Sequence, residues 1–251
     1  MSETGHVRLN NEDAILADDT RGLWLVADGV GGHAAGEVAS QLAIDTVAAE
    51  IDKGSALIPA IEQAQQTILT DVKQHPERKG MGTTLVAVKQ RRRGFELAWV
   101  GDSRVYQWQE GGQWHGSEFT PLSVDHSYVQ DMVLRGVLTE EEAQLHPQRN
   151  LVRQTLGMEL ARVKVDSRCL YPSRAGGLLL CSDGVSDMLS RSQLADILTQ
   201  DISLQDKVEA LRQAVLSTDA SDNFSAIVIS YEPGVTHRLT NRLVNRLLKN
   251  D

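Results

Sequence analysis

The sequence predicts an α+β fold in which helices cover layered antiparallel sheets. Short strand-like segments follow one another across tight turns, and strands joined in this way pair antiparallel. Long amphipathic segments accompany them, and each such helix has one apolar face to bury against a sheet. At 251 residues the chain can bury one large core, so that one domain is as plausible as two.

Each element is predicted from a local pattern. Strands are expected over 22–28, 84–90, 94–101, 103–109 and 224–231. Gly94 and the pair Gly111-Gly112 mark hairpin turns between such strands. Helices are expected over 36–52, 57–73, 192–200 and 204–217. The clearest amphipathic pattern, at i, i+3 and i+4 spacing, is formed by Leu57, Ile61, Ala64, Ile68 and Val72.

Composition and charge exclude several classes of function. The net charge of −9 argues against a general nucleic-acid binder, because phosphate backbones need a basic surface. No basic segment followed by an apolar stretch opens the chain, and no apolar run approaches the ~20 residues needed to span a bilayer. Cys169 and Cys181 lie in apolar, strand-like contexts, so we expect small buried hydrophobes in a reducing compartment rather than a disulfide. We therefore expect a cytoplasmic protein.

Six acidic residues lie in tight, turn-like settings, and apolar strand patterns lead into them. A carboxylate at the end of a buried strand is costly unless something positive compensates it. Several of them together would repel one another unless hard divalent cations lay between them, and oxygen-only ligation suits Mg²⁺ or Mn²⁺. The sequence therefore predicts a metal-dependent hydrolase. The six residues are Glu12, Asp13, Asp28, Asp102, Asp183 and Asp222.

The order and the residues of the motifs around these acids resemble those of the PPM family, the metal-dependent (2C-type) serine/threonine protein phosphatases, in its bacterial single-domain form. The resemblance runs from about Gly5 to Tyr231. One Asp-Gly pair is first of all a turn signal, whereas six motifs in family order are specific. The motifs are Arg8…Asn11-Glu12-Asp13, Ala27-Asp28-Gly29-Val30-Gly31-Gly32-His33, Met81-Gly82-Thr83-Thr84, Val100-Gly101-Asp102-Ser103-Arg104, Ser182-Asp183-Gly184 with Asp187, and Asp222-Asn223.

The resemblance implies a four-layer αββα sandwich, with two antiparallel sheets face to face, flanking helix pairs and metals at one end. It also implies a ligand set for two tightly bound Mn²⁺ or Mg²⁺ ions. Asp28 would bridge them, and Glu12 with the carbonyl of Gly29 would complete the first site. Asp183 and Asp222 would complete the second. For Asp28 the alternative is a plain hairpin-turn aspartate.

Further roles are implied for residues around the two metals. Asp13 would hold a metal-bound water. Asp102 and Asp187 match positions that, with Asp183, hold a third and weaker metal in bacterial members, although a salt-bridge or turn role is an alternative for both. Arg8 would clamp the substrate phosphate, because a guanidinium makes bidentate, permanently charged contacts with phosphate oxygens.

The implied reaction is direct hydrolysis, in which a water between the metals loses a proton and attacks phosphorus in line with the seryl or threonyl oxygen. Many family members have a histidine directly after the Asp-Gly pair, where it can protonate the leaving alkoxide, but this chain has Val30. His126 is the preferred replacement acid and His33 the second candidate, and either can instead be a surface residue. Neither cysteine lies in the loop that a cysteine-based phosphatase requires.

Three segments are predicted to have peripheral roles. Residues 121–157 match a mobile flap beside the metal site, and the alternative is a surface helical excursion without a catalytic part. The run Arg91-Arg92-Arg93 is expected at a hairpin tip, either solvated or in contact with an acidic phosphopeptide. Residues 1–232 would form the phosphatase domain and residues 233–251 a basic amphipathic tail helix. Through 235–249 the tail would pack on the domain, dock on a partner protein, or touch an anionic membrane surface.

The expected function is a protein phosphatase that acts on phosphorylated serine and threonine residues of proteins and reverses a bacterial serine/threonine kinase. We expect a monomer. The alternative is a catalytically silent, phosphoprotein-binding scaffold of the same fold, which would be expected to lack metal ligands that this chain retains. A metal nuclease is opposed by the acidic charge and by the full set of phosphatase motifs.

Overall fold

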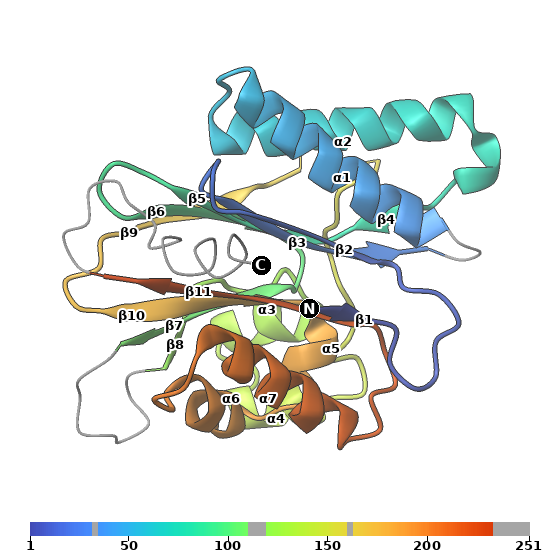
Figure 1. The fold of residues 1–251 in the computed structure, drawn as a ribbon. Coiled ribbons are helices and arrows are strands. Elements are labelled where there is room, and N and C mark those ends of the chain that lie inside the picture. Colours follow the sequence, from blue (N-terminus) through green and yellow to red (C-terminus); the bar gives the residue numbers. More distant parts are fainter. Residues whose placement is uncertain (32–34, 110–118, 160–162, 233–251) are drawn as a thin grey trace, which may run out of the picture.

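The computed structural model describes residues 1–31, 35–109, 119–159 and 163–232. Two antiparallel sheets lie face to face in it, and helices cover both outer faces (Figure 1). This is the four-layer αββα sandwich predicted from the sequence. The predicted turn at Gly111-Gly112, the residue His33 and the tail 233–251 lie outside the described ranges.

The first sheet has the strand order β2-β3-β5-β6-β9, with the short β4 paired to β3. Its strands are β2 (Asp13–Asp18), β3 (Leu23–Val30), β4 (Gly82–Thr83), β5 (Leu85–Gln90), β6 (Phe95–Val100) and β9 (Asp166–Leu170). The long helices α1 (Ala35–Asp52) and α2 (Leu57–Gln74) cover its outer face (Figure 1). The 3₁₀ turn η1 (Pro76–Arg78) follows α2.

The second sheet has the order β1-β11-β10-β7-β8. Its strands are β1 (Ser2–Glu3), β7 (Arg104–Gln109), β8 (Thr120–Pro121), β10 (Gly176–Cys181) and β11 (Phe224–Tyr231). Helices α6 (Arg191–Leu198) and α7 (Leu204–Leu216) lie on its outer face, and the short α5 (Asp183–Ser186) follows β10 (Figure 1).

Three apolar layers hold the sandwich together. The first lies between α1, α2 and the first sheet, the second between the two sheets, and the third between the second sheet and α6 and α7. Trp24, Trp99 and Leu180 belong to the middle layer, where they are almost completely buried. Burial on both faces explains why the central strands have continuous apolar runs rather than an alternating pattern.

Most predicted elements are confirmed within one or two residues at each end, and three departures have a physical cause. Strand β2 begins and ends with an aspartate, and β9 (Asp166–Leu170) is a largely exposed edge strand, so that neither has a strong apolar pattern. Cys169, predicted to be buried, is exposed because it lies on β9, whereas Cys181 on the central strand β10 is buried.

Gly94 makes the predicted turn, with φ +88° and Leu170 O only 2.0 Å from the position a Cβ would take.

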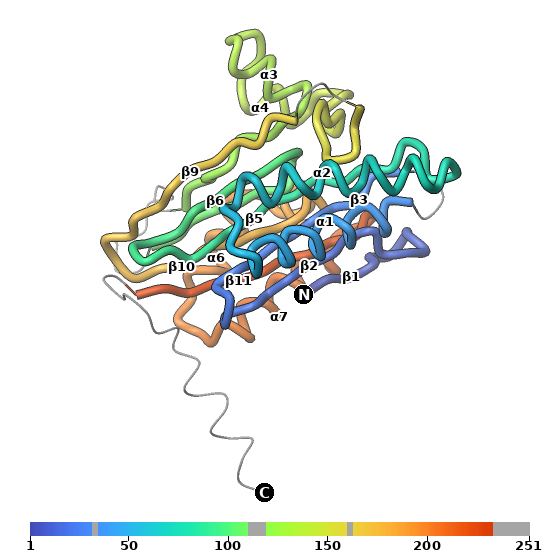
Figure 2. The backbone as a smooth tube through the Cα atoms, turned by 90° about the horizontal axis from the view of Figure 1, so that it is seen from above, coloured from blue at the N-terminus to red at the C-terminus, as the bar shows by residue number. Residues whose placement is uncertain are grey.

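Residues 121–157 project from the sandwich as a small helical segment containing α3 (Tyr128–Leu134) and α4 (Glu140–Leu145) (Figure 2). Ser127 caps the start of α3, and Thr139 with Glu142 forms a capping box at α4. Backbone bridges from Ser127 to Val152 and from Leu156 to Thr83 tie the segment to itself and to the first sheet. No helix in the described ranges is both long enough and apolar enough to cross a membrane.

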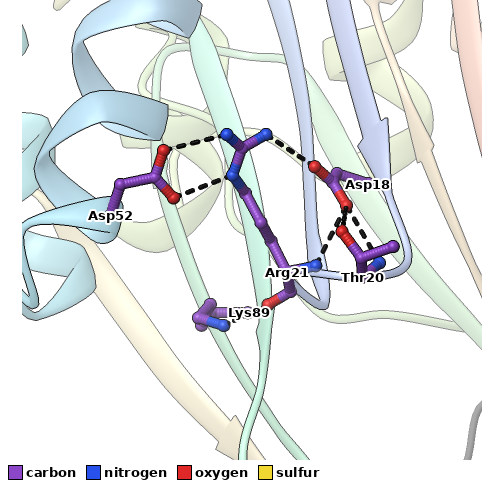
Figure 3. Close-up of polar contacts among 5 residues, drawn as sticks. All are labelled: Asp18, Thr20, Arg21, Asp52 and Lys89. Atoms are coloured by element: carbon purple, nitrogen blue, oxygen red, sulfur yellow. Dashed lines mark hydrogen bonds and ion pairs between the residues drawn. The ribbon is translucent and has the colours of Figure 1, made fainter.

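The end of the sandwich at the β2–β3 turn is closed by a network around Arg21 (Figure 3). Its guanidinium contacts Asp18 at 2.6 Å and Asp52, at the end of α1, through two hydrogen bonds of 2.8 Å. Asp18 also accepts from the backbone and hydroxyl of Thr20, and Lys89 donates to the Arg21 carbonyl. These contacts join the β2–β3 turn to α1 and β5.

Candidate metal centre

The strand register brings the predicted acids to the opposite end of the sandwich. In the β2–β3 pair, Asp13 lies directly across from Asp28. Asp102 follows the end of β6, and Asp183 follows the end of β10 as the first residue of α5. Asp222 lies two residues before the start of β11. Because these strands are antiparallel, the end of one lies beside the start of the next, and acids distant in the sequence meet at one edge.

Asp28 is held by its backbone, which leaves its carboxyl group for other contacts. Its N–H donates to Thr84 Oγ1 at 3.1 Å, and its carbonyl accepts from Thr84 N–H at 2.8 Å and from Thr83 Oγ1 at 2.9 Å. Thr84 Oγ1 lies 2.7 Å from Ser103 Oγ, next to Asp102. The Met81-Gly82-Thr83-Thr84 motif thus fixes Asp28 and links it to the loop after β6.

Glu12 and Gly29 meet in a backbone contact that only glycine permits. The N–H of Gly29 donates to the Glu12 carbonyl at 3.1 Å. A Cβ on Gly29 would lie 2.3 Å from Gly36 O, and one on Gly36 would lie 2.5 Å from Glu12 Oε2. The Glu12 carboxylate therefore rests over the first turn of α1. Ser40 of the same helix donates to the Glu12 carbonyl at 2.6 Å.

Asp13 has one satisfied and one unsatisfied carboxyl oxygen. Ser182 Oγ donates to Oδ2 at 2.8 Å, and Ser182 itself accepts from the N–H of Ser225 at 2.9 Å. The other oxygen, Oδ1, is buried and has no hydrogen-bond partner. A buried, unsatisfied carboxyl oxygen is expensive, and such atoms mark positions where a water or an ion binds.

Asp222 and Arg8 form the rim of the same end. Arg8 Nη2 lies 2.8 Å from Asp222 Oδ2, and both side chains are substantially exposed. Asn223 organises the surrounding loops: its Oδ1 accepts from Glu12 N–H at 2.9 Å, and its Nδ2 donates to Thr4 O and Asn10 O. The Asp222-Asn223 pair thus positions both the candidate ligand Glu12 and the loop that carries Arg8.

Asp102 and Asp187 lie near a cation from the protein itself. Arg104 makes a bidentate contact with Asp125, with distances of 2.6 and 3.0 Å, and lies 3.9 Å from Asp187. The charge of Arg104 lowers the pKa of Asp102 and of Asp187, although burial dominates and raises both. No role was predicted for Arg104 or Asp125, because their contact joins segments that no local pattern connects.

The buried carboxyl groups of the cluster are not fully compensated by nearby positive charge. Burial raises the pKa of Asp13 to about 7, of Asp183 to about 6 and of Asp102 to about 8. Burial, the charge of Asp183 and then that of Asp13 raise the pKa of Asp28 well above its ordinary value. A hydrogen bond between the two carboxyls adds to the raised pKa of Asp28 and partly offsets that of Asp183. Like-charged carboxyls that share a buried site retain protons unless a cation replaces them.

The residues present fit a divalent cation pair. The donor set is entirely oxygen, which suits Mg²⁺ and Mn²⁺. The buried Oδ1 of Asp13 has no hydrogen-bond partner and lacks a compensating positive charge. Within the described part of the chain, no three acidic, histidine or cysteine side chains already surround one point as a finished metal shell does. The strand register places Asp13 opposite Asp28, and a hydrogen bond joins the carboxyls of Asp28 and Asp183.

His126 lies beside this end, but both its ring nitrogens are in contact with protein groups. Nδ1 accepts from Gly101 N–H at 3.1 Å and lies 3.0 Å from Gln154 Nε2, while Nε2 lies 3.2 Å from Asp166 Oδ2. These contacts position the loop that leads to Asp102. They do not favour the acid role predicted for His126, which therefore stays a prediction. Val30, at the end of β3, is half-exposed and has no proton to give.

The fold and the cluster together define a metal-dependent phosphatase, and comparisons with known proteins identify its family. The family model for protein phosphatase 2C matches residues 4–218. The serine/threonine phosphatase stp of Listeria welshimeri is 31% identical over 241 residues, covering 91% of this chain and 93% of that protein. PstP of Mycobacterium tuberculosis is 36% identical over 246 residues, which are 94% of this chain but 45% of that longer protein.

Solved structures agree with this family assignment. The catalytic domain of PstP in complex with two manganese ions superposes with a TM-score of 0.78 at 32% identity, covering 93% of this chain and 96% of that one. The chain belongs to the protein phosphatase 2C family, the PPM family anticipated from the motifs. It is a metal-dependent protein serine/threonine phosphatase.

Proposed function

We propose that the acids at this end of the sandwich bind two divalent cations, Mn²⁺ or Mg²⁺, with Asp28 between them. Glu12 and the Gly29 carbonyl would complete one site, and Asp183 and Asp222 the other. The observation that carries this proposal is the shared environment of Asp28 and Asp183. Burial and neighbouring carboxylates raise both pKa values, with Asp183 and Asp13 acting on Asp28, and Asp187 and Asp222 acting on Asp183. When bound, the cations would lower the pKa of a water and stabilise charge on the phosphoryl oxygens.

A third, weaker site at Asp102 and Asp187 is part of the same proposal. Both carboxyls have pKa values raised by burial, as expected for acids that lack a full counter-charge. Arg104 already supplies part of the positive charge there, 3.9 Å from Asp187. A cation would therefore gain less at this position than beside Asp28, which agrees with weaker binding.

Arg8 and Asp13 would then handle the substrate and the attacking water. The guanidinium of Arg8 now pairs with Asp222 in a largely exposed position, so that the pair contributes little to stability and can exchange. If a bound cation neutralised Asp222, the same guanidinium would be free to bind phosphate oxygens in a bidentate contact. Oδ1 of Asp13 has no protein partner and can accept a proton from the water, while Ser182 holds the other oxygen in place.

We propose phosphorylated serine and threonine residues of proteins as the substrate, and reversal of a serine/threonine kinase as the role. The named relatives are serine/threonine phosphatases, which supports the substrate class. Phosphoproteomics of a deletion strain tests the role: phosphothreonine and phosphoserine sites should rise in proteins that a serine/threonine kinase modifies. An unchanged set of such sites would contradict it.

The activity itself is tested with a purified enzyme and a phosphothreonine peptide. Hydrolysis should require Mn²⁺ or Mg²⁺ and stop when EDTA is added in excess. Restoring the metal should restore the rate, which distinguishes metal removal from unfolding. Undiminished turnover after exhaustive chelation would contradict the two-metal proposal.

A further inference from the structure

The loop between β1 and β2 exposes apolar side chains that the metal centre does not explain. Leu9 is 98% exposed and Val7 is 65% exposed, and they are the two chain neighbours of Arg8. Scattered exposed apolar residues are normal on protein surfaces. These two instead flank the proposed phosphate-binding guanidinium at the rim of the active end.

This loop is anchored at both ends. The N–H of His6 donates to Ala220 O at 2.8 Å, and Asn223 Nδ2 donates at 2.9 Å to Thr4 O before the loop and to Asn10 O near its end. Gly5 has φ +78°, and a Cβ there would lie 2.3 Å from Asp222 O. A backbone held this closely to Asp222-Asn223 presents Val7 and Leu9 at a defined place beside the candidate ligand Asp222.

The position of Arg8 indicates what these side chains would meet. An extended peptide advances about 3.3 Å per residue, so residues next to a phosphoresidue held at Arg8 lie within reach of Arg8's own neighbours. Apart from Arg8, residues 5–10 are Gly, His, Val, Leu and Asn, with no carboxylate and no second permanent cation to select a charged flank. Apolar flanking side chains match Val7 and Leu9.

We propose that Val7 and Leu9 form a substrate-reading surface that selects phosphoserine and phosphothreonine sites flanked by apolar residues. The proposal rests on the proposed function, since it places the substrate phosphate at Arg8. Contact with an apolar flank removes Leu9 and Val7 from water, whereas a serine flank leaves both hydrated. The surface therefore determines which phosphopeptides are hydrolysed with the higher kcat/KM.

Two phosphothreonine peptides test this, one with leucine and one with serine on both sides of the phosphoresidue. Wild-type enzyme in Mn²⁺ should favour the leucine peptide about tenfold in kcat/KM, equivalent to ~1.4 kcal/mol. Leu9→Ser should reduce that ratio by at least about threefold, and the double variant Val7→Ser/Leu9→Ser should bring it near one. Tyr171→Ser is the matched control, because Tyr171 is 70% exposed but follows β9 at the opposite end of the sandwich. It should keep the wild-type ratio.

Each alternative outcome has a definite meaning. Equal rates on both peptides in the wild type, or a ratio unchanged in the double variant, would overturn the substrate-reading surface. An unchanged ratio with slower action on an intact phosphoprotein would also overturn it, in favour of docking by a protein partner. Failure of the wild type to hydrolyse either peptide or p-nitrophenyl phosphate in Mn²⁺ would instead reject the proposed function, and is therefore distinguishable.

Discussion

Strand β2 begins and ends with an aspartate, and the two carboxyl groups have opposite surroundings. Asp18, at the β2–β3 turn, pairs with Arg21, and hydrogen bonds from Thr20 and Arg21 lower its pKa to about 2 (Figure 3). Asp13, at the other end, faces Asp28, and burial raises its pKa to about 7. At the Arg21 end, the carboxyl group is paired with a positively charged side chain of the protein. At the other end, several carboxyl groups lie together without enough positive charge to compensate them.

The difference separates a structural use of charge from a functional one. At the Arg21 end, the carboxyls of Asp18 and Asp52 are both paired with Arg21, and the Asp52 contact joins the turn to α1. At the acid end, burial of several carboxyls and an unsatisfied oxygen on Asp13 destabilise the metal-free fold. An external ligand can supply the missing positive charge, and the proposed divalent cation pair would do so here.

Removing the proposed bridging acid, Asp28, should have the largest effect. Outer groups around metal ligands typically change activity by about 10–100-fold, so Asp28→Asn is expected to lower turnover by more than about 100-fold. Asp183→Asn should behave in the same way, and Asp102→Asn should disturb the two tight metals less. Steady-state hydrolysis of a phosphothreonine peptide at saturating Mn²⁺ measures this. Retention of more than about a tenth of wild-type turnover by Asp28→Asn would show that Asp28 is not the bridge.

Metal removal should reverse the dependence of stability on pH. The raised pKa values of Asp13, Asp183 and Asp102 mean that the metal-free fold keeps protons that the unfolded chain has lost. Its free energy of unfolding should therefore fall as pH rises from about 4, the ordinary carboxyl pKa, to about 8. With Mn²⁺ bound, the folded state holds these carboxyls deprotonated, so stability should rise only up to about pH 5, where the unfolded chain loses its protons, and stay level above that.

Melting temperatures across this window, with EDTA and with Mn²⁺, measure the reversal. Saturation to about 100 times Kd gives ~2.7 kcal/mol per site, and each kcal/mol shifts the melting temperature of a chain this size by about 2–4 °C. Parallel pH curves with and without metal would contradict the assignment of the raised pKa values to the metal centre.

His126 provides a smaller, more selective comparison. If its contacts with Gly101 and Asp166 only position the loop before Asp102, His126→Ala should slow p-nitrophenyl phosphate and phosphopeptide hydrolysis by similar factors, about tenfold. An acid would behave differently, because a threonyl alkoxide needs protonation and p-nitrophenolate needs little. A loss confined to the phosphopeptide would establish His126 as the acid that replaces the function absent at Val30.

The smallest effect is expected at the Arg21 end. Arg21→Gln removes an exposed network, and exposed ion pairs contribute little to stability, so the melting temperature should change by about 2 °C or less. Metal-dependent turnover should match that of the wild type. A large loss of turnover would instead show that the two ends of the sandwich are coupled.

The sequence predicted the central strands and the candidate acids because both leave local signals, whereas the four-layer arrangement was implied by the resemblance to the PPM family. Apolar runs identified the central strands, and the Asp-Gly and Asp-Asn turns identified acids at strand ends. The contacts that hold those acids left no such signal. Ser182 supports Asp13 across 169 positions, and Arg104 meets Asp125 only through the packing of the flap segment on β7. Edge strand β9, with its exposed Cys169, was missed because an edge strand need not be apolar.

Calorimetric titration of the metal-stripped protein with Mn²⁺ tests the central claim most directly. At near-neutral pH the wild type should bind two equivalents tightly and release protons, because the raised pKa values leave the acids partly protonated beforehand. Repeating the titration in buffers of different ionisation enthalpy counts those protons. Asp28→Asn should lose tight binding at both sites, whereas Arg21→Gln should titrate like the wild type. Absence of tight binding in the wild type, or an unchanged titration in Asp28→Asn, would contradict the claim that this end is a two-metal centre.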